Sequence, residues 1–146
     1  MVADDLTLVL EDEKAAPHEF EQLLTPLVAA VGKATGLTGI VNLRLTDNAG
    51  MKTLNRAFRN KHSATDVLAF PSGDSTNPGD IAISLERVFA QAKTYGHSST
   101  REFGYLLVHA LLHIAGYDHE NPIRQGEMRV LEEAILESVG LDLRPN

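Results

Sequence analysis

The chain has 146 residues, a formal net charge of −7 and no cysteine. This length fits one domain with a sizeable core, expected over residues 1–146. The absence of cysteine excludes a disulfide scaffold and cysteine-ligated zinc, and the acidic balance argues against nonspecific nucleic-acid binding by the whole surface. No apolar run approaches the roughly 20 residues of a membrane span, and the acidic N-terminus is unlike a secretory signal. A cytoplasmic protein without a membrane partner is expected.

Hydrophobic periodicity predicts four strands and five helices. Strands are expected at 6–10, 39–47, 66–70 and 80–84, and helices at about 17–31, 48–59, 85–95, 99–115 and 122–139. Strands that first alternate with helices, followed by a helical C-terminal half, indicate an α+β or mixed α/β fold. We therefore expect a single compact α+β domain with about four strands in a mixed sheet, packed with about five helices.

Several helix ends are marked by residues that favour them. Pro17 suits the first position of the first helix, and Gly32 and Gly36 are expected to close it. Asp47 is a suitable N-cap for the second helix. The run "STRE" at residues 99–102 has the spacing of a capping box, which predicts a helix start there.

Three of the six histidines lie within the short segment "YLLVHALLHIAGYDHE", residues 105–120. His109 and His113 are four residues apart in a predicted helix, so they share one face about 6 Å apart along the axis. Gly116 ends the helix, and the chain can then turn so that His119 returns toward the same point. Imidazole nitrogens so placed can converge on one metal ion at about 2.0–2.1 Å.

The spacing His-x3-His-x2-Gly-x2-His matches the one by which metzincin proteases gather three histidines on zinc. Three ligands without a fourth protein donor indicate an open, catalytic coordination position. Zinc is the default metal for imidazole, although nickel, copper and iron also suit it. The alternative, ordinary core or surface histidines, would leave buried ring nitrogens that need other partners. One zinc ion held by His109, His113 and His119 is therefore expected.

The residues beside these histidines help to distinguish a zinc peptidase from other zinc enzymes. In zinc peptidases the residue after the first histidine is a glutamate general base, and here it is Ala110. A peptidase is thereby disfavoured, although a base from elsewhere in the chain remains an alternative. Asp118 is either a carboxylate that orients a ligand or a turn residue. His18 and His97 are expected at the surface.

A basic segment interrupts this acidic chain. Between positions 44 and 62 the basic residues are Arg44, Lys52, Arg56, Arg59 and Lys61, and the only acid is Asp47. On the predicted helix, the buried face is expected to carry Met51, Leu54 and Phe58, and a different face Lys52, Asn55, Arg56 and Arg59. Such a stripe is either a solvated helix face or a surface for phosphate oxygens, which guanidinium groups bind with paired hydrogen bonds. Together with a metal site it favours a phosphodiester substrate over a peptide.

These motifs resemble those of the YbeY family, bacterial endoribonucleases of rRNA maturation. "HALLHIAGYDH" at 109–119 is similar to the family signature H-G-x-L-H-L-x-G-Y-D-H. "FRNKHSATDVLAFP" at 58–71 is similar to a second motif, around an arginine and T-D-V-L-S-F-P, and "GDIAIS" at 79–84 to a third. Their order and spacing agree over roughly residues 40 to 140. The sequence departs from the common pattern at Asn60, His62, Ala64, Ala69 and Ala110.

The resemblance implies a single α+β domain that holds zinc through His109, His113 and His119. It also implies metal-dependent cleavage of single-stranded RNA, with roles in maturing the 3′ end of 16S rRNA and in ribosome quality control. The small ribosomal subunit is then a partner and DNA is not a substrate. Arg59 falls on the family's functionally important arginine.

The expected mechanism is metal-assisted phosphodiester cleavage. Arg59 is expected to stabilise charge in the transition state, while Lys52, Arg56 and Lys61 hold the flanking backbone. Two rival functions remain: a zinc peptidase, and a non-enzymatic ribosome-assembly factor in which zinc only supports the fold.

Overall fold

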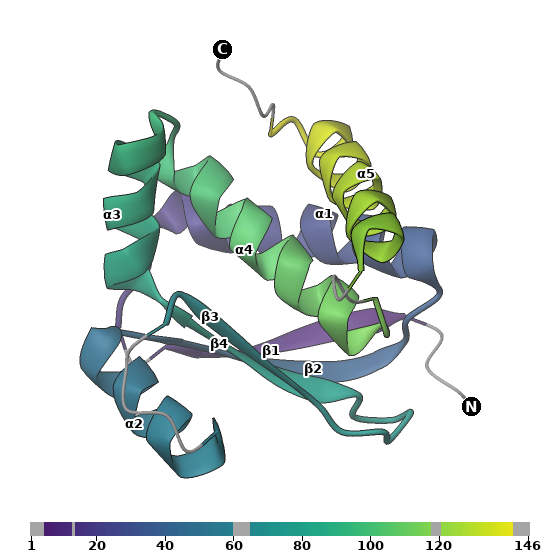
Figure 1. Ribbon diagram of the computed structural model, residues 1–146, viewed down its shortest axis with the longest axis horizontal. Coiled ribbons are helices and arrows are strands. Elements are labelled where there is room, and N and C mark those ends of the chain that lie inside the picture. The colour runs from purple at the N-terminus through teal and green to yellow at the C-terminus, as the bar shows by residue number, and fades with distance from the viewer. Residues whose placement is uncertain (1–4, 13, 60–64, 118–120, 142–146) are drawn as a thin grey trace.

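Four strands and five helices make up the part of the chain that the computed structural model describes, residues 5–12, 14–59, 65–117 and 121–141 (Figure 1). The strands are Leu6–Asp12 (β1), Gly39–Thr46 (β2), Val67–Pro71 (β3) and Gly79–Ser84 (β4). The helices are His18–Thr35 (α1), Asn48–Arg59 (α2), Leu85–Tyr95 (α3), Ser99–Ile114 (α4) and Pro122–Ser138 (α5). The expected α+β fold with a four-stranded mixed sheet is confirmed.

The sheet has the strand order β1-β2-β4-β3. β1, β2 and β4 are parallel, and β3 runs antiparallel to β4 at one edge. α1 joins β1 to β2, because parallel neighbours need a long crossover connection. On β2, Val41, Leu43 and Leu45 are all buried, since every second side chain of a strand points to the same face.

Helices cover the two faces of the sheet unequally (Figure 1). α1, α3, α4 and α5 lie on one side, where Ile81 and Ile83 of β4 join the main core. α2 lies on the other side, and its Met51 packs in a small cluster with Leu68 and Ala82. β4 is therefore buried on both faces, which explains why its apolar residues do not alternate with polar ones.

α4 crosses the middle of the helical layer and contacts α1, α3, α5 and the strands β3 and β4. Gly104 makes this close packing possible. A Cβ atom at this position would lie 2.5 Å from Cδ1 of Leu141 and 3.2 Å from Cδ2 of Leu23. The neighbouring segments therefore hold α4 from several sides, which gives its side chains a rigid base.

The limits of α1 differ slightly from those expected. The helix begins at His18, with Pro17 as the residue that precedes it, and it continues through Gly32. It ends at Gly36, whose φ of 76° is left-handed. Only Gly36 adopts the backbone conformation that stops a helix, so Gly32 is accommodated within it. Among the helices of the described residues, neither α1 nor any other has the length and apolarity to cross a bilayer.

The expected capping box of α4 is wrong by one residue. Ser98, not Ser99, is the N-cap, and its Oγ accepts a hydrogen bond from the backbone N–H of Arg101 at 3.1 Å. Glu102 is buried, so its carboxylate does not reach back to the helix start. The carboxylate of Glu102 instead contacts Gln91 and His97, so Ser99 and Glu102 do not form the expected capping box.

Candidate functional site

One narrow stripe of α4 reaches the surface. From Arg101 to Ile114, every residue of the helix is buried except Arg101, Tyr105, His109 and His113, which are half-buried. These four follow one another at intervals of four, so they form one line along the helix. The stripe thereby brings two of the predicted metal ligands to the surface of an otherwise buried helix.

His109 and His113 lie side by side on this stripe. Their ring centroids are 4.8 Å apart and the ring planes meet at 75°, an edge-to-face arrangement. Side chains on successive turns of one helix face can direct ring nitrogens at a common point. The third predicted ligand, His119, and its neighbour Asp118 lie outside the described residues.

A tight turn follows the two histidines. Gly116 adopts a φ of 102°, which L residues with side chains rarely adopt. Its N–H donates to the carbonyl of His113 at 3.0 Å, and the N–H of Tyr117 donates to the carbonyl of Leu112 at 2.9 Å. These hydrogen bonds close the last turn of α4 after Ile114, so the left-handed stop expected at Gly116 is present.

Glu132 of α5 is the site residue that sequence reasoning missed. Its Oε2 lies 2.5 Å from Nδ1 of His109, and only 6% of the residue is exposed. A metal-ligating histidine almost always donates its other ring N–H to a carboxylate, a backbone carbonyl or a water, and Glu132 is placed to be that acceptor for His109. The available signal was an acid within the predicted buried stripe of the last helix, four residues after Met128.

Charged side chains of both signs surround Tyr105, and the guanidinium carbon of Arg101 lies 5.9 Å from the centroid of its ring. The ring of Tyr105 is 5.8 Å from that of His109. Burial, together with the negative charges of Glu132 and Glu102, raises the pKa of Tyr105 to about 12, while Arg129 opposes the shift. Tyr105 therefore stays neutral near pH 7, and the carboxylates around it favour a cation beside the histidines.

Asp66 connects the second sequence motif with this site. Its negative charge also acts on Tyr105 to raise the pKa of the phenol, so the start of β3 lies close to the middle of α4. The Asp66 carboxylate accepts a hydrogen bond from the N–H of Val67 at 2.8 Å, and its carbonyl accepts one from the N–H of Ser84 at 3.0 Å. Asp66, in the second sequence motif, is thereby held at the start of β3, and β3 packs against α4.

The basic helix α2 is present, but its expected polar face needs one correction. Lys52 and Arg56 are exposed, whereas Asn55 is only 3% exposed. Asn55 follows Met51 by four residues and therefore shares its buried face. The backbone of Arg59 ends α2. The side chain of Arg59 and all of Lys61 lie outside what the structure describes, as do Asn60, His62 and Ala64.

Asp47 caps α2 as expected. Its Oδ1 accepts a hydrogen bond from the N–H of Gly50 at 2.8 Å, and its Oδ2 lies 3.3 Å from Nζ of Lys14. Both contacts stabilise the ionised carboxylate, and the hydrogen bond from Gly50 contributes most to lowering the pKa of Asp47. This acid in the basic segment therefore has a structural role at the start of the helix.

His97 was expected at the surface, and this expectation is wrong. Its Nε2 lies 2.6 Å from Oε1 of Glu102, and its side chain is 14% exposed. Gln91 donates to Oε2 of the same carboxylate at 2.7 Å. The buried Glu102 thus ties the end of α3 and the loop after it to α4. His18 is exposed, as expected.

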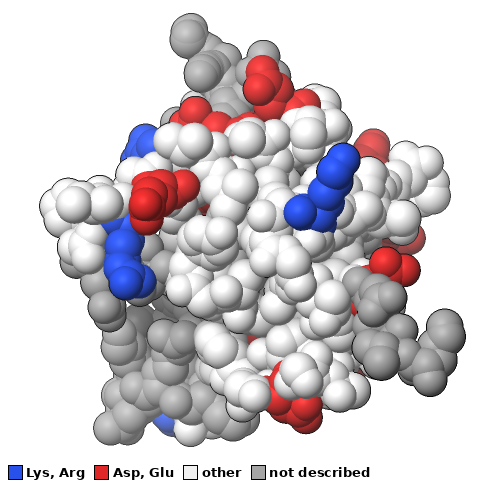
Figure 2. Space-filling model, turned by 90° about the vertical axis from the view of Figure 1, so that its right-hand side faces the viewer, with Lys and Arg blue, Asp and Glu red and all other residues white. Residues whose placement is uncertain are grey.

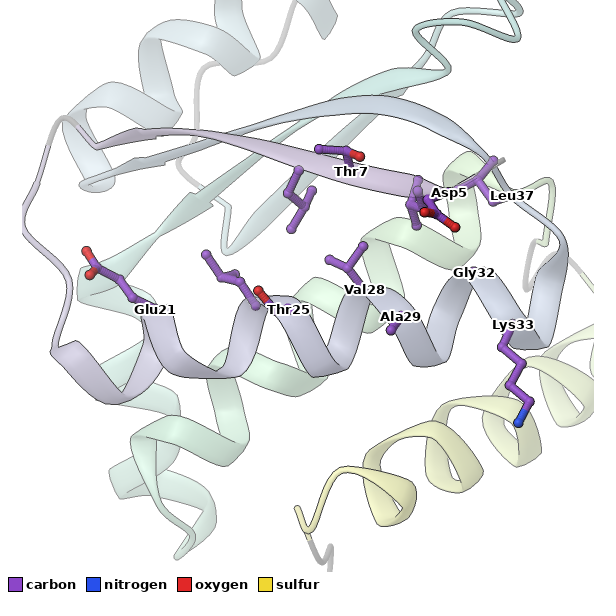
Figure 3. Close-up of a pocket in the computed structure, with 12 residues that line it drawn as sticks. Asp5, Thr7, Glu21, Thr25, Val28, Ala29, Gly32, Lys33 and Leu37 are labelled. Atoms are coloured by element: carbon purple, nitrogen blue, oxygen red, sulfur yellow. The ribbon is translucent and has the colours of Figure 1, made fainter. Parts of the chain in front are cut away.

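In the described part of the chain, hollows lie between β1 and α1, beside β2 and β4 near Leu54 of α2, and at the turn after α4. Figure 2 shows the face on the right of Figure 1, where the described Lys and Arg side chains stand apart instead of forming a continuous basic surface. A hollow of about 730 Å³ lies between β1 and α1 (Figure 3), and Thr25, Val28 and Lys33 help to line it. Another, of about 840 Å³, adjoins the turn after α4 and is lined by residues that include Gly116 and Arg124.

The fold and the site define a small α+β protein whose central helix presents a histidine pair supported by a buried carboxylate. Residues 7–140 match the family model described as Endoribonuclease YbeY. The chain therefore belongs to the YbeY family.

Individual relatives agree with this assignment. The Endoribonuclease YbeY of Carboxydothermus hydrogenoformans is 39% identical, over 91% of this chain and 95% of the relative. That of Alkaliphilus metalliredigens is 44% identical, over 93% of this chain and 97% of the relative. The solution structure of TM1509 from Thermotoga maritima is similar in fold, with a TM-score of 0.64 and 27% identity over 91% of this chain and 90% of that one.

Proposed function

We propose that this chain is a zinc-dependent endoribonuclease that cleaves single-stranded RNA. The proposal rests on the His109–His113 pair, with Glu132 bonded to His109, in a chain whose relatives bear the name endoribonuclease. Its proposed cellular substrate is ribosomal RNA, at the 3′ end of 16S rRNA during late maturation and in ribosome quality control. The proposed partner is the small ribosomal subunit, in the cytoplasm.

The donor set fits a zinc ion. His109, His113 and His119 would hold it through neutral imidazole nitrogens, and no cysteine competes for the metal. The contact of Glu132 with Nδ1 of His109 supports this assignment, because it leaves Nε2 as the ligating atom. A zinc ion held there would supply polarisation of a phosphate oxygen, or would lower the pKa of a bound water to about 7.

Two groups of charged residues would have different tasks: acids lie beside the histidines of α4, and basic residues lie on α2, on the other side of the sheet. Glu132, Glu102 and Asp66 all act electrostatically on Tyr105 beside the histidines, and these carboxylates would repel an RNA phosphate unless a cation lies between them. Lys52 and Arg56 are exposed on α2, and with Lys61 they would hold the flanking phosphates. Arg59 would donate to the phosphate oxygens as charge builds on them during cleavage.

The local residues also weaken the peptidase alternative. Ala110 is 1% exposed and carries no group that moves a proton. Glu132 does contact His109, but it comes from α5 and its carboxylate bonds to Nδ1 of the ring. It therefore does not take the place of the peptidase glutamate, which follows the first histidine in the chain. A phosphodiester substrate therefore suits these residues better than a peptide.

The test is a cleavage assay on the purified chain, beside elemental analysis. We expect stoichiometric zinc and cleavage of unstructured RNA but not of a matched duplex. A chelator should abolish cleavage, and added zinc should restore it. A 2′,3′-cyclic phosphate together with a 5′-OH would identify the ribose 2′-OH as the attacking group, and a 5′-phosphate together with a 3′-OH would identify water.

Two outcomes would overturn the enzyme proposal. Bound zinc without cleavage of any RNA would instead support a non-enzymatic assembly factor. Zinc-dependent degradation of an unfolded protein without RNA cleavage would support a peptidase.

A further inference from the structure

Glu132 is a charged residue at a position where its helix is otherwise apolar. The other buried residues of α5 are Met128, Ile135 and Leu136. Burying an ionised carboxylate is unfavourable unless the group has a strong partner. The contact between Oε2 of Glu132 and Nδ1 of His109, 23 residues earlier in the chain, provides that partner.

This contact determines which ring nitrogen of His109 carries hydrogen. An ionised carboxylate only accepts hydrogen bonds, so Nδ1 of His109 must donate to Glu132. In a neutral imidazole the other nitrogen, Nε2, then carries the lone pair. The bond also fixes the ring plane, because Glu132 is held in the core by its neighbours on α5.

We infer that Glu132 is a positioning residue for the metal ligand His109, which it holds in the Nδ1–H tautomer with Nε2 directed to the metal. The inference rests on the proposed function for the identity of the metal. The tautomer itself is a property of the metal-free chain. A purely structural role, in which Glu132 only attaches α5 to α4, predicts lower stability but unchanged zinc affinity in folded variants.

The experiment compares Glu132→Ala and Glu132→Gln with wild type in two measurements. The first is the tautomer of His109 in chelator-treated protein, from imidazole ¹⁵N chemical shifts that are assigned with a His109→Gln variant. The second is zinc affinity, by competition with a chromophoric chelator. Glu133→Ala is the matched control, because Glu133 is the next residue on α5 and is exposed.

In wild type and in Glu133→Ala we expect one Nδ1–H tautomer and equal zinc affinity. In Glu132→Ala we expect loss of the single tautomer and zinc binding weaker by about 10–100-fold. Glu132→Gln keeps the size of the side chain and an acceptor oxygen but no charge. Its zinc affinity should therefore fall between those of wild type and Glu132→Ala.

Zinc affinity equal to wild type in Glu132→Gln would overturn the inference. If Glu132→Ala does not fold, the zinc affinity of Glu132→Gln tests the inference by itself. An Nε2–H tautomer of His109 in wild type would overturn it as well. The proposed function fails separately. A wild type that binds zinc with His109 in the Nδ1–H form but cuts no RNA would refute the nuclease and leave the role of Glu132 intact.

Discussion

His109 and His113 lie one helical turn apart on α4, with ring centroids 4.8 Å apart. Because two donors on one face bind a metal far better than one, we expect His113→Ala to lose bound zinc and RNA cleavage together. Elemental analysis and the cleavage assay measure the two losses. His18→Ala is the control, since His18 is an exposed histidine on α1. Stoichiometric zinc in His113→Ala would show that the ligand assignment is wrong.

Replacement of Arg59 separates catalysis from metal binding. In Arg59→Ala we expect zinc content and melting temperature to match wild type, while cleavage of single-stranded RNA falls by about 100-fold or more. The physical reason is the loss of a charged donor to the phosphate oxygens in the transition state.

The control for Arg59→Ala is Lys93→Ala, which removes an exposed positive charge from the last turn of α3. Both variants change the net charge equally, so a general electrostatic effect would weaken cleavage in both. Equal cleavage by Arg59→Ala and wild type would remove Arg59 from the mechanism.

Asp47 makes the stability of the protein depend on pH in acid. The backbone hydrogen bond from Gly50, together with Lys14, lowers the pKa of Asp47 in the folded state below 3.8. The unfolded chain therefore takes up the proton first. The stabilisation is complete above the unfolded value and is lost as the pH falls through the folded one.

Asp47→Asn retains a helix-capping oxygen but loses this titration. We expect it to be less stable than wild type at about pH 7, with the difference shrinking toward about pH 2. Denaturant unfolding across this range measures the change. A constant difference between the two proteins would contradict the pKa assignment.

Gly39 is required where β2 begins beside the β3–β4 loop. Its φ is 103°, and an added Cβ would lie 2.7 Å from the carbonyl oxygen of Ser75 and 2.8 Å from that of Thr76. Gly39→Ala should therefore combine backbone strain with a steric clash and cost roughly 2 kcal/mol or more of unfolding free energy.

Gly36→Ala isolates the backbone part of this effect. Gly36 also has a positive φ, 76°, but an added Cβ would have no atom within 4 Å. We expect a loss of about 1 kcal/mol from strain alone. Thermal or denaturant unfolding of both variants gives the comparison. A Gly36→Ala loss as large as that of Gly39→Ala would mean that the loop moves away at no cost.

Local patterns in the sequence determined the elements and two members of the site. Alternation along β2, the apolar stripe of α1 and the cap at Asp47 act between near neighbours in the chain, so they can be read without knowing the fold. His109 and His113 are recognisable for the same reason, because four residues make one turn of a helix.

Only the tertiary structure decided which side chains from distant parts of the chain contact one another. Glu132 contacts His109, 23 residues earlier in the chain, because α5 packs on α4. Glu102 contacts His97 and Gln91 because α3 also packs on α4. Burial and the pairing of charges follow from how helices and strands pack against one another, and a one-dimensional pattern does not contain that packing.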